Sequence, residues 1–368
     1  MRPSIPSLTS LRFVAALFVV IFHYKVSDIG SRRLDFPEAI SSFGYEAVTF
    51  FFVLSGFILT YVHVRADSSI QQLNVSARSF FASRLARILP AYFIALAIAA
   101  PFFVRNYFAA STPDTLLFAS GLVLVPLLLQ AWYPPANLLW NAPAWSLSVE
   151  LFFYAVYPAF TYALRRCSNV RFFFGSLAVV LAIGALRQTL ASEAWQNFWA
   201  YSPLVHLPQF VFGAALARLF VFEKPRSPLE LESMMATAIL LLIPIIAYKP
   251  EIAWLANSGF LAVVFGIVIF GAAGARGPLT RILSADTLVL LGEASYALYI
   301  MHWPMLVWWR LVTRKYLTFE LSPIVDFVCY LALAMCLSVL IFLYVERPMR
   351  RYLFAKLAEP AGKQALEK

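Results

Sequence analysis

Eleven long apolar segments, separated by short polar connections, run through this sequence of 368 residues. A helix needs about 20 apolar residues to cross the hydrocarbon core of a bilayer, and most of these segments are close to that length. Only 13% of the residues are charged, against about 25% in a soluble domain. The pattern predicts an all-α polytopic membrane protein. The segments are 7–24, 44–64, 88–104, 115–131, 145–164, 171–190, 203–222, 232–248, 252–273, 287–309 and 323–345.

The basic residues between these segments indicate topology, because cytoplasmic loops are enriched in Lys and Arg. If the N-terminus is inside, the basic connections at Arg84 and Arg165 both face inward only when an even number of segments crosses between them. Three segments lie there, so one of them does not cross. Segment 115–131, which Pro126 interrupts, is expected to be re-entrant or interfacial. We therefore expect about ten transmembrane helices in one bundle in the plasma membrane, with both termini cytoplasmic.

The expected domain organisation is simple, because the sequence has no fixed-period repeat and no low-complexity segment. Residues 1–351 are predicted to form one transmembrane domain, followed by a polar cytoplasmic tail at 352–368. The formal charge of +10 is assigned to topology and to contacts with membrane lipids, and no nucleic-acid motif accompanies it. The three cysteines lack metal-ligand spacing, so no metal is expected.

The first apolar segment contains two residues that are costly inside a membrane, Arg12 and His23. A charge at the centre of a spanning helix costs about 2.5–3.5 kcal/mol on insertion scales, so such residues mostly serve function. Eleven residues of helix separate the two by about 16 Å along the axis and by only about 20° around it. Both side chains should therefore point from one helix face into the protein.

Polar residues near the ends of other segments are candidates for the same site. Arg84 and Arg87, one helical turn apart, suit phosphate groups through their guanidinium forks, although an anchor to lipid headgroups explains them at least as well. Glu150 lies about one and a half turns after Trp145, among apolar residues. Depth arithmetic places Glu150 beside His23, where a carboxylate would orient a general base. The alternative is a structural contact from Glu150 to an Arg or Tyr.

The tenth apolar segment carries a polar stripe formed by Ser295, Tyr299 and His302. Their spacing of i, i+4 and i+7 places them on one helix face, so they are candidate substrate-binding residues. A packing role for His302 agrees with the sequence equally well. The pair Ser55 and Gly56 either lets two helices pack closely or admits a ligand, and close packing is the simpler interpretation.

Together, and in this order, six motifs resemble the integral-membrane acyltransferase family 3, whose members O-acylate sugars of surface polysaccharides, lipids and secondary metabolites. The resemblance covers nearly the whole chain. It rests on Arg12-x10-His23, FFFVLSGF from Phe50, Arg84-x-x-Arg87, WSLSVE ending at Glu150, SYALYIMHWP from Ser295, and Glu346-Arg-Pro348.

The resemblance implies a membrane O-acyltransferase that uses cytoplasmic acyl-coenzyme A (acyl-CoA), most often acetyl-CoA, and a glycan or glycolipid hydroxyl as acceptor. Arg84 and Arg87 would bind the phosphates of the donor. His23 would act as general base or carry the acyl group, and Glu150 would orient it. Arg12 would meet the donor or stabilise its thioester oxygen. A secondary transporter is the alternative interpretation, because transporters also hold His, Glu and Arg within the membrane.

Overall fold

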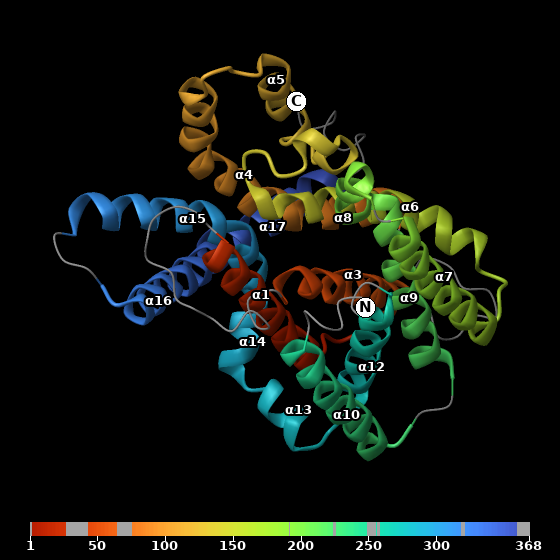
Figure 1. Ribbon diagram of the computed structural model, residues 1–368. Coiled ribbons are helices and arrows are strands. Elements are labelled where there is room, and N and C mark those ends of the chain that lie inside the picture. The colour runs from red at the N-terminus through yellow and green to blue at the C-terminus, as the bar shows by residue number, and fades with distance from the viewer. Residues whose placement is uncertain are drawn as a thin grey trace, which may run out of the picture.

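The structure is a computed structural model in which helices form almost all of the described chain (Figure 1). In Figure 1, α1 (Pro6–Val26) and α3 (Gly44–His63) lie at the centre, with the other helices around them. The prediction of an all-α fold is confirmed within this part of the chain. The described residues are 2–26, 43–64, 76–190, 192–223, 226–248, 255, 258–317 and 321–358.

Seven helical stretches in the described chain are long and apolar enough to cross a membrane. This agrees with a polytopic membrane protein. Three further helices have 15 residues or more, namely α6 (Trp145–Ala163), α12 (Phe260–Gly274) and α15 (Ser295–Tyr316). The seven stretches are Pro6–Val26, Gly44–His63, Ala77–Ala109, Asn169–Leu190, Gln196–Phe222, Pro228–Ala247 and Pro323–Ala358.

Several of these stretches correspond to single helices and others join more than one. Stretch Gln196–Phe222 joins two helices across Ser202, and Pro323–Ala358 contains a π-helical turn. The elements concerned are α4 (Ala77–Ala109), α7 (Asn169–Leu190), η4 (Glu193–Trp195), α8 (Gln196–Tyr201), α9 (Pro203–Phe222), α10 (Pro228–Ala247), α16 (Pro323–Ile341), η5 (Phe342–Glu346) and α17 (Arg347–Ala358).

The segment predicted not to cross is short in the structure. Helix α5 (Thr115–Leu124) has 10 residues, about 15 Å of helix against a hydrocarbon core of about 30 Å. After it the chain makes three short 3₁₀ turns before α6 begins. Their bounds are η1 (Gln130–Trp132), η2 (Pro134–Ala136) and η3 (Ala142–Ala144).

Two boundaries differ from the sequence-based prediction. The span predicted at 287–309 is two helices, α14 (Asp286–Glu293) and α15, with the break at Ala294; a further short helix, α13 (Pro278–Leu283), precedes them. Helix α4 begins eleven residues before the predicted start, because Ser76 caps it by accepting a hydrogen bond from the Ser79 amide. The division into a domain at 1–351 and a tail at 352–368 stays a prediction; helix α17 continues to Ala358, and residues 359–368 lie outside the described chain.

Helices α1 and α3 run antiparallel. Arg2, just before α1, donates a hydrogen bond to the carbonyl of Tyr61 near the end of α3. A Cβ on Gly44, at the start of α3, would overlap Phe22 near the end of α1. Helix α17 joins the start of α4, since Arg78 donates to the carbonyl of Leu357 at 2.9 Å. We call this side of the bundle, with the starts of α1 and α4, the α17 end.

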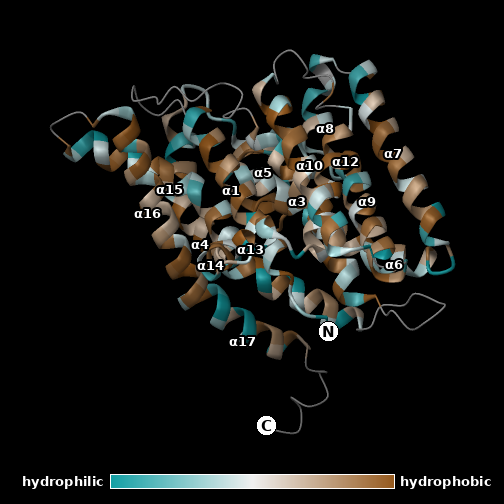
Figure 2. Ribbon diagram, turned by 90° about the horizontal axis from the view of Figure 1, so that it is seen from below, coloured by the Kyte–Doolittle hydropathy of each residue, from teal (hydrophilic) through white to brown (hydrophobic). Residues whose placement is uncertain are grey.

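Hydropathy agrees with this arrangement. Figure 2 shows hydrophobic residues along most of the bundle helices, and hydrophilic residues on α17 and at the ends of other helices. None of the α17 side chains is buried, and four of them are Arg or Lys. The His23 end of α1 therefore lies opposite a strongly basic end of the molecule.

Candidate active site

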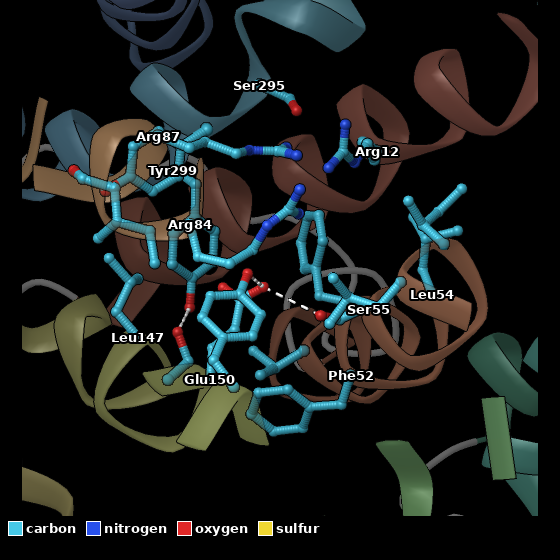
Figure 3. Close-up of a pocket in the computed structure, with 18 residues that line it drawn as sticks. Arg12, Phe52, Leu54, Ser55, Arg84, Arg87, Leu147, Glu150, Ser295 and Tyr299 are labelled. Atoms are coloured by element: carbon cyan, nitrogen blue, oxygen red, sulfur yellow. Dashed lines mark hydrogen bonds between the residues drawn. The ribbon is translucent and has the colours of Figure 1, made fainter. Parts of the chain in front are cut away.

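An arginine-lined cavity of about 80 Å³ lies between α1, α3, α4, α6 and α15 (Figure 3). Arg12, Arg84 and Arg87 point towards its centre, and Glu150 borders the same space. Three guanidinium groups and one carboxylate leave a formal excess of two positive charges. We call this space the arginine cavity. Its composition favours an anionic ligand.

The three arginines come together through helical spacing and helix crossing. Arg84 and Arg87 lie within α4 rather than before it, one turn apart on the same side. Arg12 reaches the cavity from α1. Arg84 donates from Nε to the Ser83 hydroxyl at 3.2 Å, whereas Arg12 and Arg87 form no hydrogen bond with any residue in the described ranges. Their fork donors are therefore open to a ligand.

Glu150 does not contact His23, which corrects the predicted pairing. Its Oε1 accepts hydrogen bonds from the Tyr154 hydroxyl at 2.5 Å and from the Ser55 hydroxyl at 3.1 Å. The predicted depth of Glu150 assumes that α6 starts at the membrane surface. In the structure α6 starts inside the bundle, since all of 145–149 is buried, and Glu150 therefore lies deeper, among the arginines.

Ser55 and Gly56 serve two purposes. Ser55 lines the arginine cavity and binds Glu150. A Cβ on Gly56 would overlap the backbone carbonyl of Phe210, and a Cβ on Gly213 would overlap that of Val53. Helices α3 and α9 therefore cross in backbone contact, as expected for small residues at a helix interface.

The partner of His23 is His302. His23 Nδ1 lies 3.2 Å from His302 Nε2 and 3.0 Å from the carbonyl oxygen of Val19, and His302 Nδ1 lies 3.2 Å from that of Leu298. A carbonyl only accepts, so we assign the proton of each neutral ring to Nδ1. The single Nδ1–H of His23 is then shared between the Val19 carbonyl and His302 Nε2, and Nε2 of His23 keeps its lone pair. This is the arrangement of a general base with a positioning partner.

A buried cluster beside the histidines joins three helices. Asp326 of α16 and Arg310 of α15 form an ion pair at 3.2 Å, with exposed fractions of 0% and 5%. Tyr24, next to His23, donates to the same carboxylate oxygen at 2.5 Å, and Trp309 donates to the other at 3.1 Å. The Tyr330 hydroxyl also donates to the carbonyl of His302 at 2.9 Å. These bonds hold the ends of α1, α15 and α16 together.

The predicted substrate-binding residues divide between the two places. Ser295 and Tyr299 line the arginine cavity, and Tyr299 shares a hydrogen bond of 2.6 Å with Ser146 of α6. His302 belongs to the histidine pair, and its ring lies 6.2 Å from that of Tyr299. Tyr299 thus contacts both the cavity and the histidines.

Ser146 is not among the predicted site residues, Tyr154 makes the alternative contact expected of Glu150, and Glu346 enters the prediction only as part of the Glu346-Arg-Pro348 motif. Tyr154 lies four residues after Glu150 on one helix, a spacing that predicts their contact. Glu346, in the π-turn η5, is buried, and its Oε2 has no hydrogen-bond partner in the described chain. No local pattern locates Ser146 opposite Tyr299. Among the described residues, no group of three or more His, Cys, Asp or Glu is placed to hold a metal ion.

Comparison with known proteins identifies the family. A family model described as "Acyltransferase domain" matches residues 5–343, nearly the whole chain. The chain belongs to acyltransferase family 3. It therefore belongs among the acyltransferases, which favours an enzyme over the transporter interpretation. No solved structure matches the chain.

Named relatives of this acyltransferase are distant in sequence. It is 27% identical to "Acyltransferase MdmB" of Streptomyces mycarofaciens, covering 81% of this chain and 78% of the relative. It is 24% identical to "Peptidoglycan O-acetyltransferase OatA" of Listeria monocytogenes, covering 95% of this chain and 56% of the relative. It is 22% identical to "O-acetyltransferase OatA" of Staphylococcus aureus, covering 96% and 58%. The chain thus spans a little over half the length of the two OatA proteins.

Proposed function

We propose that this acyltransferase moves an acyl group, most often acetyl, from acyl-CoA to a hydroxyl of a glycan or glycolipid. The observation that carries the proposal is the convergence of Arg12, Arg84 and Arg87 on one cavity, where Arg12 and Arg87 hydrogen-bond to no described residue. CoA carries phosphates, which guanidinium forks bind well. The printed names of the OatA relatives support acetyl transfer, and one of them names peptidoglycan as acceptor.

The donor would approach from the α17 end. Arg350 of α17 interacts electrostatically with Arg84 and Arg87, which extends the positive charge towards that end. A cavity of about 80 Å³ holds one part of a CoA molecule rather than the whole. We assign the phosphates to Arg84 and Arg87, and the pantetheine arm to the path that leads along α1 and past Tyr299 towards His23. About 16 Å of helix separates Arg12 from His23.

The chemistry would take place at His23. Its Nε2 lone pair accepts the proton of the acceptor hydroxyl while that oxygen bonds to the thioester carbonyl carbon. The tetrahedral oxyanion collapses, the carbon–sulfur bond breaks, and the proton passes from imidazolium to the CoA thiolate. The products are the ester and free CoA, so atoms and charge balance. The Val19 carbonyl holds His23 in the tautomer that this step needs, and His302 orients the ring.

The membrane orientation follows from the same proposal. We place the protein in the plasma membrane with the α17 end facing the cytoplasm, where acyl-CoA is present. The basic residues Arg78, Arg347, Arg350 and Arg351 lie at that end, in agreement with the positive-inside rule. The His23 end would then face the acceptor on the other side.

The experiment is an assay of purified protein in lipid nanodiscs, with acetyl-CoA binding and CoA release measured separately. His23→Ala should lower CoA release in the presence of acceptor on the order of 10²- to 10⁴-fold and leave acetyl-CoA affinity unchanged. Arg84→Ala with Arg87→Ala should weaken acetyl-CoA binding by at least about tenfold.

The matched control removes two arginines that lie outside the cavity, Arg166 and Arg171, both exposed near the start of α7. Arg166→Ala with Arg171→Ala should bind acetyl-CoA as the wild type does. If both double variants weaken acetyl-CoA binding equally, Arg84 and Arg87 are lipid anchors rather than donor-binding residues. Full CoA release by His23→Ala would remove His23 from the mechanism.

A further inference from the structure

A second, much larger cavity of about 560 Å³ lies away from the arginine cavity. Its lining comes from the far end of α4, from α5, from residues 138–140 and from the middle of α15. Arg105, which lines it, lies 18 residues after Arg87 on α4, about 27 Å further along the helix axis. This cavity is therefore at the end of the bundle opposite to α17. We call it the aromatic cavity.

The histidine pair lies between the two cavities. One turn and a half of α15 carries Tyr299, which lines the arginine cavity, then His302, then Trp303 and Pro304, which line the aromatic cavity. The ring of Trp303 lies 5.4 Å from that of His23. Trp303 therefore lies between a molecule in the aromatic cavity and the ring of His23.

We propose that the aromatic cavity binds the acceptor of the acyl group and that the acceptor presents a sugar ring there. This inference rests on the proposed function and adds the site and chemical class of the second substrate. The cavity combines aromatic walls with a few polar side chains, the composition typical of specific small-molecule sites. The site that results places donor and acceptor on opposite sides of His23 and His302.

The polar side chains match the hydroxyls of a sugar. Arg105 supplies donors, Asp114 supplies acceptors and Asn106 supplies both. Arg105 and Asn106 form no hydrogen bond or ion pair with any residue in the described part of the chain. A sugar both donates and accepts through its hydroxyls, so one ring can pair with both kinds of group.

The aromatic wall is rigid and held in an unusual conformation. Trp140 has φ 65°, in the left-handed region that a side-chain-bearing residue rarely adopts. Its ring stacks on that of Phe103, with 4.7 Å between the ring centroids and an angle of 3° between the ring planes. Its Nε1 donates a hydrogen bond to the carbonyl of Leu96 at 2.9 Å. Such conformations cost about 1–3 kcal/mol and cluster at ligand sites. An apolar face this fixed suits the flat C–H face of a pyranose ring.

The test is photolabelling of the full chain in lipid nanodiscs with an octyl β-D-glucoside that carries a diazirine on the sugar. Peptides are mapped by mass spectrometry, with and without an excess of a soluble N-acetylglucosamine tetramer or of octanol. We expect label on 99–118 and 138–140, removed by the soluble tetramer for a polysaccharide-type acceptor, or only by unlabelled octyl glucoside for a lipid-linked sugar. Label that octanol alone removes would show a lipid-facing crevice and would overturn the proposal.

Variants of the polar lining residues test the sugar site without changing Trp140, the residue with the unusual backbone conformation. Arg105→Ala and Asn106→Ala, both exposed at the cavity, should reduce sugar-competed labelling by about tenfold. Val123→Ala is the control, because Val123 is exposed on α5 and outside the lining. Equal labelling of all four proteins would contradict the assignment.

The same preparations are assayed for CoA release from acetyl-CoA, which separates the two proposals. Sugar-competed labelling without CoA release would support the sugar site and overturn the acyl-transfer function. CoA release without sugar-competed labelling would leave the function and overturn the aromatic cavity as acceptor site. Loss of both would overturn both.

Discussion

The imidazole of His23 has two neighbours at the same nitrogen. Val19 and His302 both lie within hydrogen-bonding distance of Nδ1. Because a neutral imidazole has one N–H, an Nδ1 that donates leaves Nε2 as the basic atom. In the proposed mechanism, Val19 fixes the tautomer of His23, and His302 is a positioning residue that orients its ring.

This role predicts a graded series at position 302. His302→Ala should lower kcat on the order of 100-fold and leave the KM for acetyl-CoA nearly unchanged, because the proposed anchor of the donor is its phosphates at Arg84 and Arg87. His302→Gln, whose amide oxygen accepts a hydrogen bond, should recover part of that loss. The measurement is steady-state kinetics of both variants. Equal kcat losses in Ala and Gln, or a rise in donor KM, would point to a packing role alone.

The neighbours of Glu150 are only partly predictable from the sequence. Its chemistry as a membrane-buried acid is readable from the sequence, and so is the contact to Tyr154 four residues later. Whether Glu150 lies beside His23 or among the arginines cannot be read from the sequence, because it depends on the depth at which α6 begins. Residues 145–149 are buried, and the carboxylate balances part of the charge of the arginine cavity.

The contact between α3 and α9 gives the bundle its tightest crossing. Gly56 and Gly213 face the backbone of the other helix so closely that a Cβ at either position would overlap a carbonyl oxygen. Ser55, beside this contact, lines the arginine cavity. The crossing therefore sets the position of one wall of the site.

Gly56→Ala should consequently destabilise the protein and disturb the site together. Overpacking in a close-packed interior typically costs about 1–3 kcal/mol, so we expect a thermal unfolding midpoint lower by about 5 °C. The control is Gly175→Ala on α7, where a Cβ would meet nothing within 4 Å. Thermal unfolding in detergent compares the two, and an unchanged midpoint in Gly56→Ala would contradict backbone contact between α3 and α9.

Over the whole molecule, the order of parts is an arginine cavity towards the α17 end, a histidine pair, and an aromatic cavity beyond it. Under the proposed function, this order would place the donor and the acceptor on opposite sides of one base. The proposal then expects the two ends of the bundle to face different compartments.

Cysteine labelling in whole cells tests that orientation. With the three native cysteines replaced, Ser111→Cys, exposed between α4 and α5, should react with a membrane-impermeant maleimide in intact cells. Ser168→Cys, exposed between α6 and α7, should react only after permeabilisation. The reverse pattern would invert the proposed topology, and labelling of both in intact cells would contradict a crossing between them.

Composition and periodicity determined by themselves that this chain is a helical membrane protein, and ordered motifs indicated its family. They also placed Arg84 and Arg87 on one helix face, because helical spacing is a local property. Tertiary structure alone decided that His23 meets His302, that Glu150 joins the arginines, and that Trp140 walls a second cavity. These outcomes depend on where each helix begins relative to its neighbours. The irregular turns between α5 and α6 set that depth for Glu150 and Trp140, and no local pattern encodes it.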